Sequence, residues 1–422
     1  MTLEWLEKWA YRFAILTLPL GTIWLWSFGS VRGTPWAFGN LGIGVGECFV
    51  FVAVMCAMAR GNFGLKCPGQ SPDRLAKFSI PAYFLALIWF GLLFGRALSS
   101  DFQFVAILGT VRYVLAGLLL MIAAPISTEE IAQLWILGMI IPGLLAVLQI
   151  FVWHAGISST LLGIAAHPLM APGTSVIEIA GERFMRAYGS FAHPNIFGAY
   201  LVLSLILLLR DWRSSSRIIL LVFGFILALT FSRGAILAFG AYFIAEIFLK
   251  TVPIKRFLPI GFGLIIGIMI FLPVYGARID VNGERLEKKS TNQRIESLAT
   301  GFELFKRNPL VGVGVFQSVP ALAIQNPSKS VWDFEPAHFM PLLMLAEWGI
   351  LGFSVFIALV FLMWCDLGRE KRRKLIPVIA AACVLGAFDH ALLTSSQLLF
   401  LFALSLKVVL DGDPGTPAYA TK

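Results

Sequence analysis

Residues 217–249 read RIILLVFGFILALTFSRGAILAFGAYFIAEIFL, two apolar runs joined by the turn Thr230-Phe231-Ser232-Arg233-Gly234. Apolar runs of roughly this length are typical of membrane-spanning helices. The turn is too short to form a solvent-exposed loop, so Arg233 is either a functional cation or an anchor at the membrane interface. The rest of the chain repeats the pattern of apolar runs and short polar turns.

The composition agrees with this pattern. Of the 422 residues, 58% are hydrophobic and 14% are charged, against about 45–50% and 25% in a soluble domain. The mean hydropathy of +0.82 excludes a soluble enzyme, and the long runs differ from the short alternating strands of a β-barrel. We therefore expect an all-α polytopic membrane protein.

Apolar windows predict about twelve membrane spans. They fall near residues 11–28, 41–59, 78–98, 103–124, 133–153, 194–209, 217–231, 234–249, 257–275, 339–363, 375–389 and 394–410.

Positive charge orients the spans. Short cytoplasmic loops are rich in Lys and Arg, and fifteen basic residues fall on loops of one parity. They are Arg60, Lys66, Arg74, Lys77, Arg210, Arg213, Arg217, Lys250, Lys255, Arg256, Arg369, Lys371, Arg372, Arg373 and Lys374. This side is predicted to be cytoplasmic, together with both termini. The net charge of +9 therefore reflects orientation and not a nucleic-acid partner.

Two long segments, 154–193 and 276–338, fall on the exoplasmic side. We treat residues 1–410 as one transmembrane domain that includes them, and 411–422 as a disordered cytoplasmic tail. In the second segment, apolar residues recur at spacings of three and four from Ile295 to Phe305. They predict an amphipathic helix on the membrane surface, capped by Ser290 or Thr291 and ended by Asn308-Pro309.

Arginines gather at the exoplasmic interface. Arg183 and Arg186 precede the span that begins at Pro194, and Arg294 lies at the head of the amphipathic helix. A guanidinium group offers planar pairs of donors that match a diphosphate and offset its charge without a metal. Interfacial anchoring is the alternative for each.

His338 stands at the exoplasmic end of a span and Asp389 at the end of another. An imidazole, with an ordinary pKa of about 6.5, suits a general base or a diphosphate ligand, and Asp389 could orient it. A plain interfacial hydrogen bond is the alternative.

Three ionisable residues fall inside the predicted hydrocarbon layer: Glu47, Arg112 and Glu347. Each would cost about 2.5–3.5 kcal/mol at mid-bilayer by insertion scales, so they should pair or face a cavity. Arg112 is accordingly either a diphosphate ligand or part of a structural salt bridge. The five cysteines indicate no disulfide framework, and no His, Cys or carboxylate set on the exoplasmic side indicates a metal or cofactor site.

The sequence resembles the O-antigen ligase and polymerase superfamily of bacterial membrane proteins. The resemblance covers roughly residues 183–389. The residues that carry it are Arg186-x-x-Gly189, Pro194-Asn195, Ser232-Arg233-Gly234, Asn308-Pro309-Leu310, Gly312-x-Gly314, His338 and Glu347-x-Gly349-x-x-Gly352. The run Pro336-Ala337-His338-Phe339 departs from the Pro-His-Asn-like run that is common in the family.

This resemblance implies a C-type glycosyltransferase of the bacterial inner membrane with a periplasmic active site. The donor would be a glycan on undecaprenyl diphosphate and the acceptor a sugar hydroxyl of lipid A-core, with inversion and without a metal. Arg183, Arg186, Arg233 and Arg294 would bind the diphosphate. His338 would activate the acceptor, supported by Asp389.

Other functions stay open. Within the superfamily, an O-antigen polymerase comes second and a protein O-oligosaccharyltransferase third, because protein-directed members tend to carry a longer C-terminal extension. A secondary transporter of an anion would need charges near the midplane, whereas the polar clusters here lie in one-sided loops. We therefore expect an O-antigen ligase.

Overall fold

The computed structural model describes residues 2–21, 23–26, 41–62, 79–153, 158–159, 164, 166–171, 173–210, 216–279, 285–330 and 333–411. Several features predicted above fall outside these ranges: Lys66, Arg74, Lys77 and Arg213, most of the segment 154–165, and the tail from 412.

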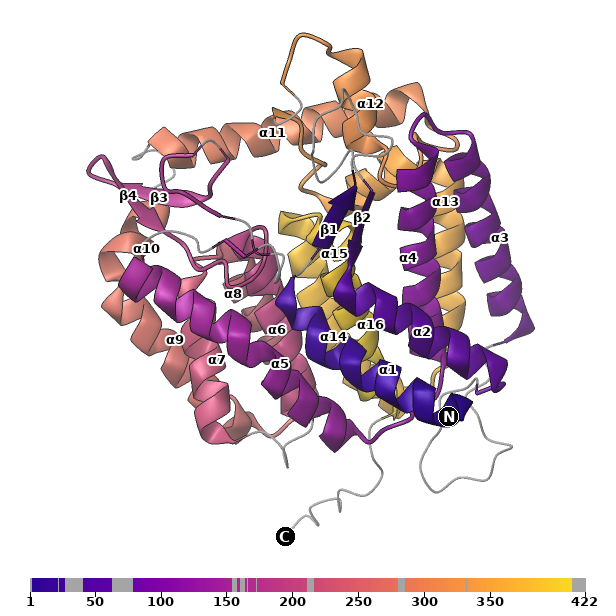
Figure 1. Ribbon diagram of the computed structural model, residues 1–422, viewed down its shortest axis with the longest axis horizontal. Coiled ribbons are helices and arrows are strands. Elements are labelled where there is room, and N and C mark those ends of the chain that lie inside the picture. The colour runs from indigo at the N-terminus through magenta and orange to yellow at the C-terminus, as the bar shows by residue number, and fades with distance from the viewer. Residues whose placement is uncertain are drawn as a thin grey trace.

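The described part of the chain is mainly helical (Figure 1). Its long helices are α1 (Leu3–Thr17), α2 (Val45–Ala59), α3 (Ile80–Leu98), α4 (Gln103–Met121), α5 (Thr128–Leu148), α6 (Pro194–Arg210), α7 (Arg217–Leu229), α8 (Arg233–Leu249), α9 (Leu258–Ile270), α11 (Arg285–Arg307), α13 (Met340–Asp366), α14 (Arg369–Phe388) and α16 (Ser396–Asp411). The short elements are η1 (Leu18–Leu20), η4 (Gln149–Trp153), η5 (Ile254–Arg256), α10 (Leu272–Ile279), α12 (Ser318–Gln325) and α15 (Ala391–Thr394).

Two antiparallel hairpins complete the fold. β1 (Ile23–Trp26) pairs with β2 (Leu41–Gly44), and β3 (Val176–Ile179) pairs with β4 (Glu182–Met185). Both hairpins, α11 and α12 lie at one end of the molecule, and the N-terminus lies at the other (Figure 1). This grouping places the polar segments on one side of the helical body.

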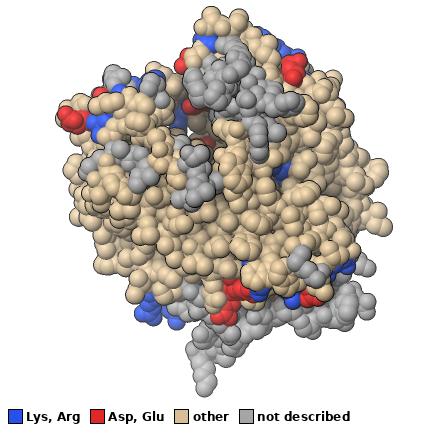
Figure 2. Space-filling view, viewed as in Figure 1, with Lys and Arg blue, Asp and Glu red and all other residues tan. Residues whose placement is uncertain are grey.

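Four helices in the described ranges are long and apolar enough to cross a membrane, and a bent pair would make a fifth. The four are α3, α4, α5 with η4, and α13. Figure 2 shows Lys, Arg, Asp and Glu mainly at the two ends of the visible face, with a broad uncharged belt between them. The prediction of a helical membrane protein is confirmed, whereas the number of twelve spans stays a prediction.

Two predicted spans begin or end differently from the expectation. The helix predicted over 11–28 ends at Thr17, because Pro19 and Gly21, whose φ is +63°, stop it before strand β1. The run predicted from residue 41 opens with strand β2, so its helix starts at Val45. Apolar composition alone did not separate a strand from a helix here.

The predicted span 257–275 is not one straight helix. α9 and α10 meet at an angle of 84°. Pro273 has no backbone N–H to continue the α9 ladder, so the helix breaks next to it. The break brings α10 against β3 and places the backbone oxygen of Arg278 2.7 Å from Nη1 of Arg233 at the start of α8.

The amphipathic helix was predicted with a wrong start. α11 already includes Arg285 and therefore carries Ser290 and Thr291 in its interior, although its end at Arg307 agrees with the Asn308-Pro309 signal. The residues before Ser290 are mostly Arg, Leu, Glu and Lys, which are strong helix formers. A serine or threonine therefore did not mark the cap.

Helix α6 lies at the centre of the core. Nearly all its residues are buried, and it packs against α7, α8 and α16. Trp135 of α5 donates a hydrogen bond to Ser204 of α6 at 2.9 Å. This hydrogen bond fixes α6, and with it the first turn of the helix, against α5.

Candidate active site

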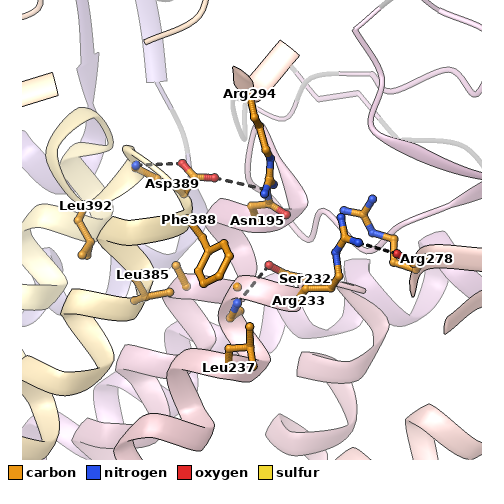
Figure 3. A pocket seen from close by; sticks show the side chains of 14 residues that line it. Asn195, Ser232, Arg233, Leu237, Arg278, Arg294, Leu385, Phe388, Asp389 and Leu392 are labelled. Carbon is orange, nitrogen blue, oxygen red and sulfur yellow. Dashed lines mark hydrogen bonds between the residues drawn. The ribbon is translucent and has the colours of Figure 1, made fainter. Parts of the chain in front are cut away.

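A cavity of about 270 Å³ opens where α6, α8, α10, α11 and α14 come together. Its polar lining consists of Asn195, Ser232, Arg233, Arg278, Arg294 and Asp389 (Figure 3). Its apolar lining includes Leu237, Leu385, Phe388 and Leu392. The cavity is therefore amphipathic, with cations on one wall and hydrocarbon on another.

The short turn before α8 places Arg233. Ser232 caps the helix by accepting a hydrogen bond from the N–H of Ala235 at 3.4 Å, and Arg233 is the first helical residue. Its Nη1 donates to the backbone oxygen of Arg278 at 2.7 Å. A helix N-terminus carries partial positive charge and favours anions, so the helix adds to the charge of the arginine.

Arg278 and Arg294 bring two more guanidinium groups to the cavity. Arg278 is 5% exposed, and its Nε donates to the backbone oxygen of Phe231 at 3.4 Å. The Arg294 side chain has no hydrogen-bond or ion-pair partner among the described residues, and it extends from α11 toward Asn195 and Asp389 (Figure 3). Three cations and one carboxylate make this cavity suited to an anion such as a diphosphate.

Asp389 and His338 lie at one side of this cavity. Asp389 follows α14; one of its oxygens accepts from the N–H of Ala391 at 3.0 Å and the other from Asn195 Nδ2 at 3.3 Å. His338 does not line the cavity, but a ring nitrogen of His338, one of His390 and a carboxylate oxygen of Asp389 lie within 4.8 Å of one another. The predicted proximity of His338 and Asp389 is thus present in the fold.

The direct partner of His338 is Glu335. His338 Nε2 lies 3.0 Å from Glu335 Oε2, and this hydrogen bond lowers the pKa of Glu335. An ionised carboxylate only accepts, so Nε2 carries the proton in neutral His338. Nδ1 then holds the open lone pair, and in the described structure it is buried without a hydrogen-bond partner.

Arg186 stands behind the cavity. It is 2% exposed and donates to the backbone oxygen of Thr230, to Ser175 Oγ and to Asn195 Oδ1, the last at 2.7 Å. Asn195 in turn donates to Asp389, so Arg186 contacts a residue that lines the cavity. Arg186 therefore supports the site but does not line the cavity.

The other two predicted diphosphate ligands lie elsewhere. Arg183 donates to the backbone oxygen of Leu169 at 2.8 Å. Arg112 forms a salt bridge of 3.0 Å with Glu47, which matches the alternative of a structural pair. Neither lines the cavity, so the structure brings only Arg233 and Arg294 of the five predicted arginines into it.

Sequence reasoning missed Arg278 and Glu335 as site residues. Arg278 lies in α10, directly after the broken span, and a charged residue that ends an apolar run is a weak signal. Glu335 lies three residues before His338, and that short spacing was the available signal. Both contacts depend on how the loop folds back.

The glycine motif Gly312-x-Gly314 packs closely against Glu347 and Gly349, and this packing supports the site. Gly312 has a φ of +66°, and a Cβ there would lie 2.4 Å from the backbone oxygen of Glu347. Gly349 has a φ of +65°, and a Cβ there would lie 2.3 Å from the backbone oxygen of Leu310. Both positions therefore require glycine. The carboxylate of Glu347 accepts from the N–H of Phe316 at 3.0 Å, so this residue holds backbone and does not pair with Arg112.

One set of side chains has the composition of a metal site. His338, Asp389 and His390 combine two imidazoles with a carboxylate. Burial lowers the pKa of His390 to about 4, so its ring is neutral near pH 7. Its Nδ1 lies 2.7 Å from Thr394 Oγ1. The expectation of a metal-free enzyme stays a prediction that chelation can test.

Comparison with known proteins supports the family resemblance. Residues 218–357 match a family model described as O-Antigen ligase, whereas a search of curated proteins finds no match. The matched segment contains Arg233, Arg278, Arg294, Glu335 and His338. This match supports the resemblance to the O-antigen ligase superfamily over residues 218–357 of the chain.

Proposed function

We propose that this protein is an O-antigen ligase of the bacterial inner membrane. It transfers a glycan from undecaprenyl diphosphate to a sugar hydroxyl of lipid A-core on the periplasmic face, with inversion and without a metal. The observation that carries the proposal is the cavity in which Arg233, Arg278 and Arg294 lie close to Asp389, next to His338.

The three arginines bind the donor diphosphate. Each guanidinium group is permanently charged and can donate paired hydrogen bonds to phosphate oxygens. The charge on the leaving diphosphate grows as the sugar–phosphate bond breaks, so fixed cations lower the barrier. The apolar residues on the opposite wall, Leu237 and Leu385 among them, suit the first isoprene units of the lipid.

His338 takes the proton of the acceptor hydroxyl. The hydroxyl oxygen attacks the anomeric carbon of the donor, the bond from that carbon to the phosphate oxygen breaks, and the lipid diphosphate leaves with the bonding electrons. The proton moves to His338 Nδ1, because Glu335 holds the Nε2 proton. One in-line displacement of this kind inverts the anomeric configuration.

Gene disruption followed by gel analysis of lipopolysaccharide tests the assignment. A ligase predicts loss of all capped lipopolysaccharide while lipid-linked polymer accumulates. Core that carries a single repeat unit would assign the chain as the polymerase instead. Unchanged lipopolysaccharide with altered glycoprotein would assign a protein O-oligosaccharyltransferase.

A further inference from the structure

A second cavity, of about 300 Å³, lies between α3 and α13 and is closed by the loop that carries Gly314. It shares no lining residue with the candidate active site. Both helices are long and apolar enough to cross a membrane, and they run side by side in Figure 1. The cavity therefore opens along the part of the protein that faces lipid.

Two glycines of α3 keep this groove open. Gly91 and Gly95 are four residues apart, so they share one face of the helix. A Cβ added at either position would meet nothing within 4 Å, so these glycines do not serve close helix packing. Leu93, Trp348 and Leu351 supply an apolar lining. These glycines and apolar side chains form a groove of the kind that holds an acyl chain.

The exoplasmic end of the groove carries a positive charge. Arg96 lies in the last turn of α3; its Nε donates to the backbone oxygen of Gly312 at 3.0 Å and its Nη1 to Ser99 Oγ at 3.1 Å. No carboxylate within the described ranges forms a salt bridge with it. The nearby Glu347 is engaged with the backbone of Phe316. An apolar groove suits the acyl chain of a lipid, and a guanidinium group without a carboxylate partner at its end suits a phosphorylated headgroup.

We infer that this groove binds the acceptor of the proposed reaction, a phosphorylated and acylated glycolipid. The inference rests on the proposed function. α13 joins the groove to the site, because His338 lies just before Met340 and Glu347 lines the groove. Seven helical residues span roughly 10 Å. A glycolipid whose acyl chain occupies the groove can therefore extend its sugars toward His338, while the donor occupies the other cavity.

The experiment measures binding of purified lipid A-core, without O-antigen, to the full chain in phosphatidylcholine nanodiscs. Gly95→Leu and Gly91→Leu fill the groove where space exists, and Arg96→Gln removes the charge. Gly261→Leu in α9 is the matched control, because a Cβ there also meets nothing within 4 Å. We expect each groove variant to weaken binding at least tenfold, with the control and the donor KM unchanged.

Dephosphorylated lipid A-core tests the role of Arg96. Wild type should bind it about tenfold more weakly than the phosphorylated form, and Arg96→Gln should bind the two equally. The inference is overturned if the groove variants bind lipid A-core as tightly as wild type does and still transfer the glycan to it. A second result would also overturn it: groove variants that no longer bind the anionic phospholipid phosphatidylglycerol but keep the wild-type KM for lipid A-core. Failure of the proposed function is distinct: wild type would then neither bind lipid A-core nor glycosylate it.

Discussion

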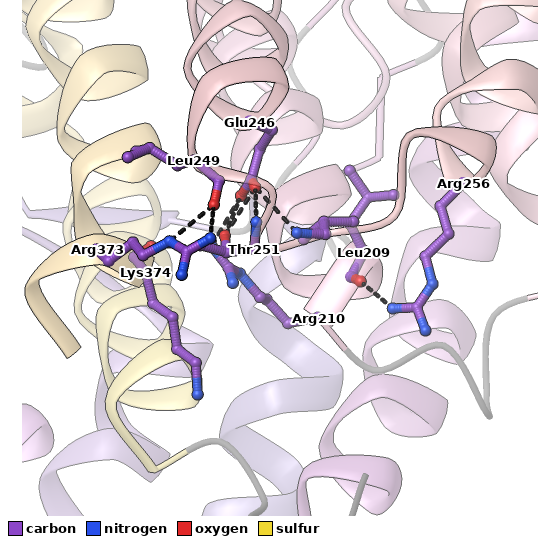
Figure 4. A network of polar contacts seen from close by, with 9 residues as sticks. Leu209, Arg210, Glu246, Leu249, Thr251, Arg256, Arg373 and Lys374 are labelled. Atoms are coloured by element: carbon purple, nitrogen blue, oxygen red, sulfur yellow. Dashed lines mark hydrogen bonds and ion pairs between the residues drawn. The ribbon is translucent and has the colours of Figure 1, made fainter. Parts of the chain in front are cut away.

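The two ends of α8 use the same residue types for different purposes. Near its end, Glu246 has a side chain that is 1% exposed and accepts from Arg210 at 2.9 Å and from the N–H groups of Thr251 and Val252 at 3.0 Å each (Figure 4). At its start, Arg233 faces a cavity of about 270 Å³ (Figure 3).

The two ends differ in the partners that their arginine side chains have. Around Glu246 the neighbouring arginines donate to main-chain oxygens: Arg210 to Lys374, Arg373 to Leu249 and Arg256 to Leu209. This network ties α6, α8 and α14 together. Around Arg233, by contrast, Arg294 has no described partner for its charge. A guanidinium group that pairs with a carboxylate and with main-chain oxygens indicates a structural role, and one without such partners indicates a place for a ligand.

His338→Ala should have the largest effect on activity. If this histidine is the base, turnover should fall about 10²-fold or more, the usual scale for losing such a group, while donor affinity is kept. Rates with purified donor and acceptor, together with thermal unfolding to confirm the fold, check this. A variant of near-normal rate would remove His338 from the mechanism.

Glu335→Gln should have the next largest effect. The carboxylate holds the Nε2 proton and stabilises the imidazolium that forms in the reaction, so turnover should fall about tenfold. Neutral imidazole is the working form, and the rate therefore falls toward acid. Rates with purified donor and acceptor check this, and a wild-type rate in Glu335→Gln would remove Glu335 from the mechanism.

Glu246→Ala should separate stability from activity. Removing one partner of a buried pair leaves an uncompensated charge and costs about 3–5 kcal/mol. Thermal unfolding should therefore shift to lower temperature, whereas kcat per folded molecule should change less than twofold. A large loss of kcat in folded protein would contradict the contrast between the two ends of α8.

Chelation should have the smallest effect. Arginines alone offset the charge of the leaving group in the proposed mechanism, so EDTA should leave the rate unchanged. The contrary result, activity lost to EDTA and restored by a divalent cation, would make His338, Asp389 and His390 a metal site.

Long, continuous apolar runs could be predicted from the sequence within a few residues. α3, α4 and α13 are examples, because a run of this length has one stable form in a membrane. The hairpin of β1 and β2 and the break before Pro273 could not, because an apolar window averages over the proline or glycine that ends a helix.

The site was predictable where local sequence restricts a residue. Arg233 sits in a turn with no room for a solvent loop, and Arg294 is carried by a periodic helix. Arg186 carried the same charge signal, but its partners Thr230 and Ser175 come from other parts of the chain. Which arginine faces the cavity is set by such tertiary contacts, and sequence spacing does not report them.

The most direct test of the account measures the affinity of undecaprenyl diphosphate, without a glycan, for the purified protein in EDTA. Arg233→Ala and Arg294→Ala should each weaken binding at least tenfold, and lysine at either position should restore only part of it, because lysine lacks the planar donor pair. Arg307→Ala, at the far end of α11, is the control and should bind as wild type does. Wild-type affinity in both cavity variants would contradict the claim that these arginines hold the donor diphosphate.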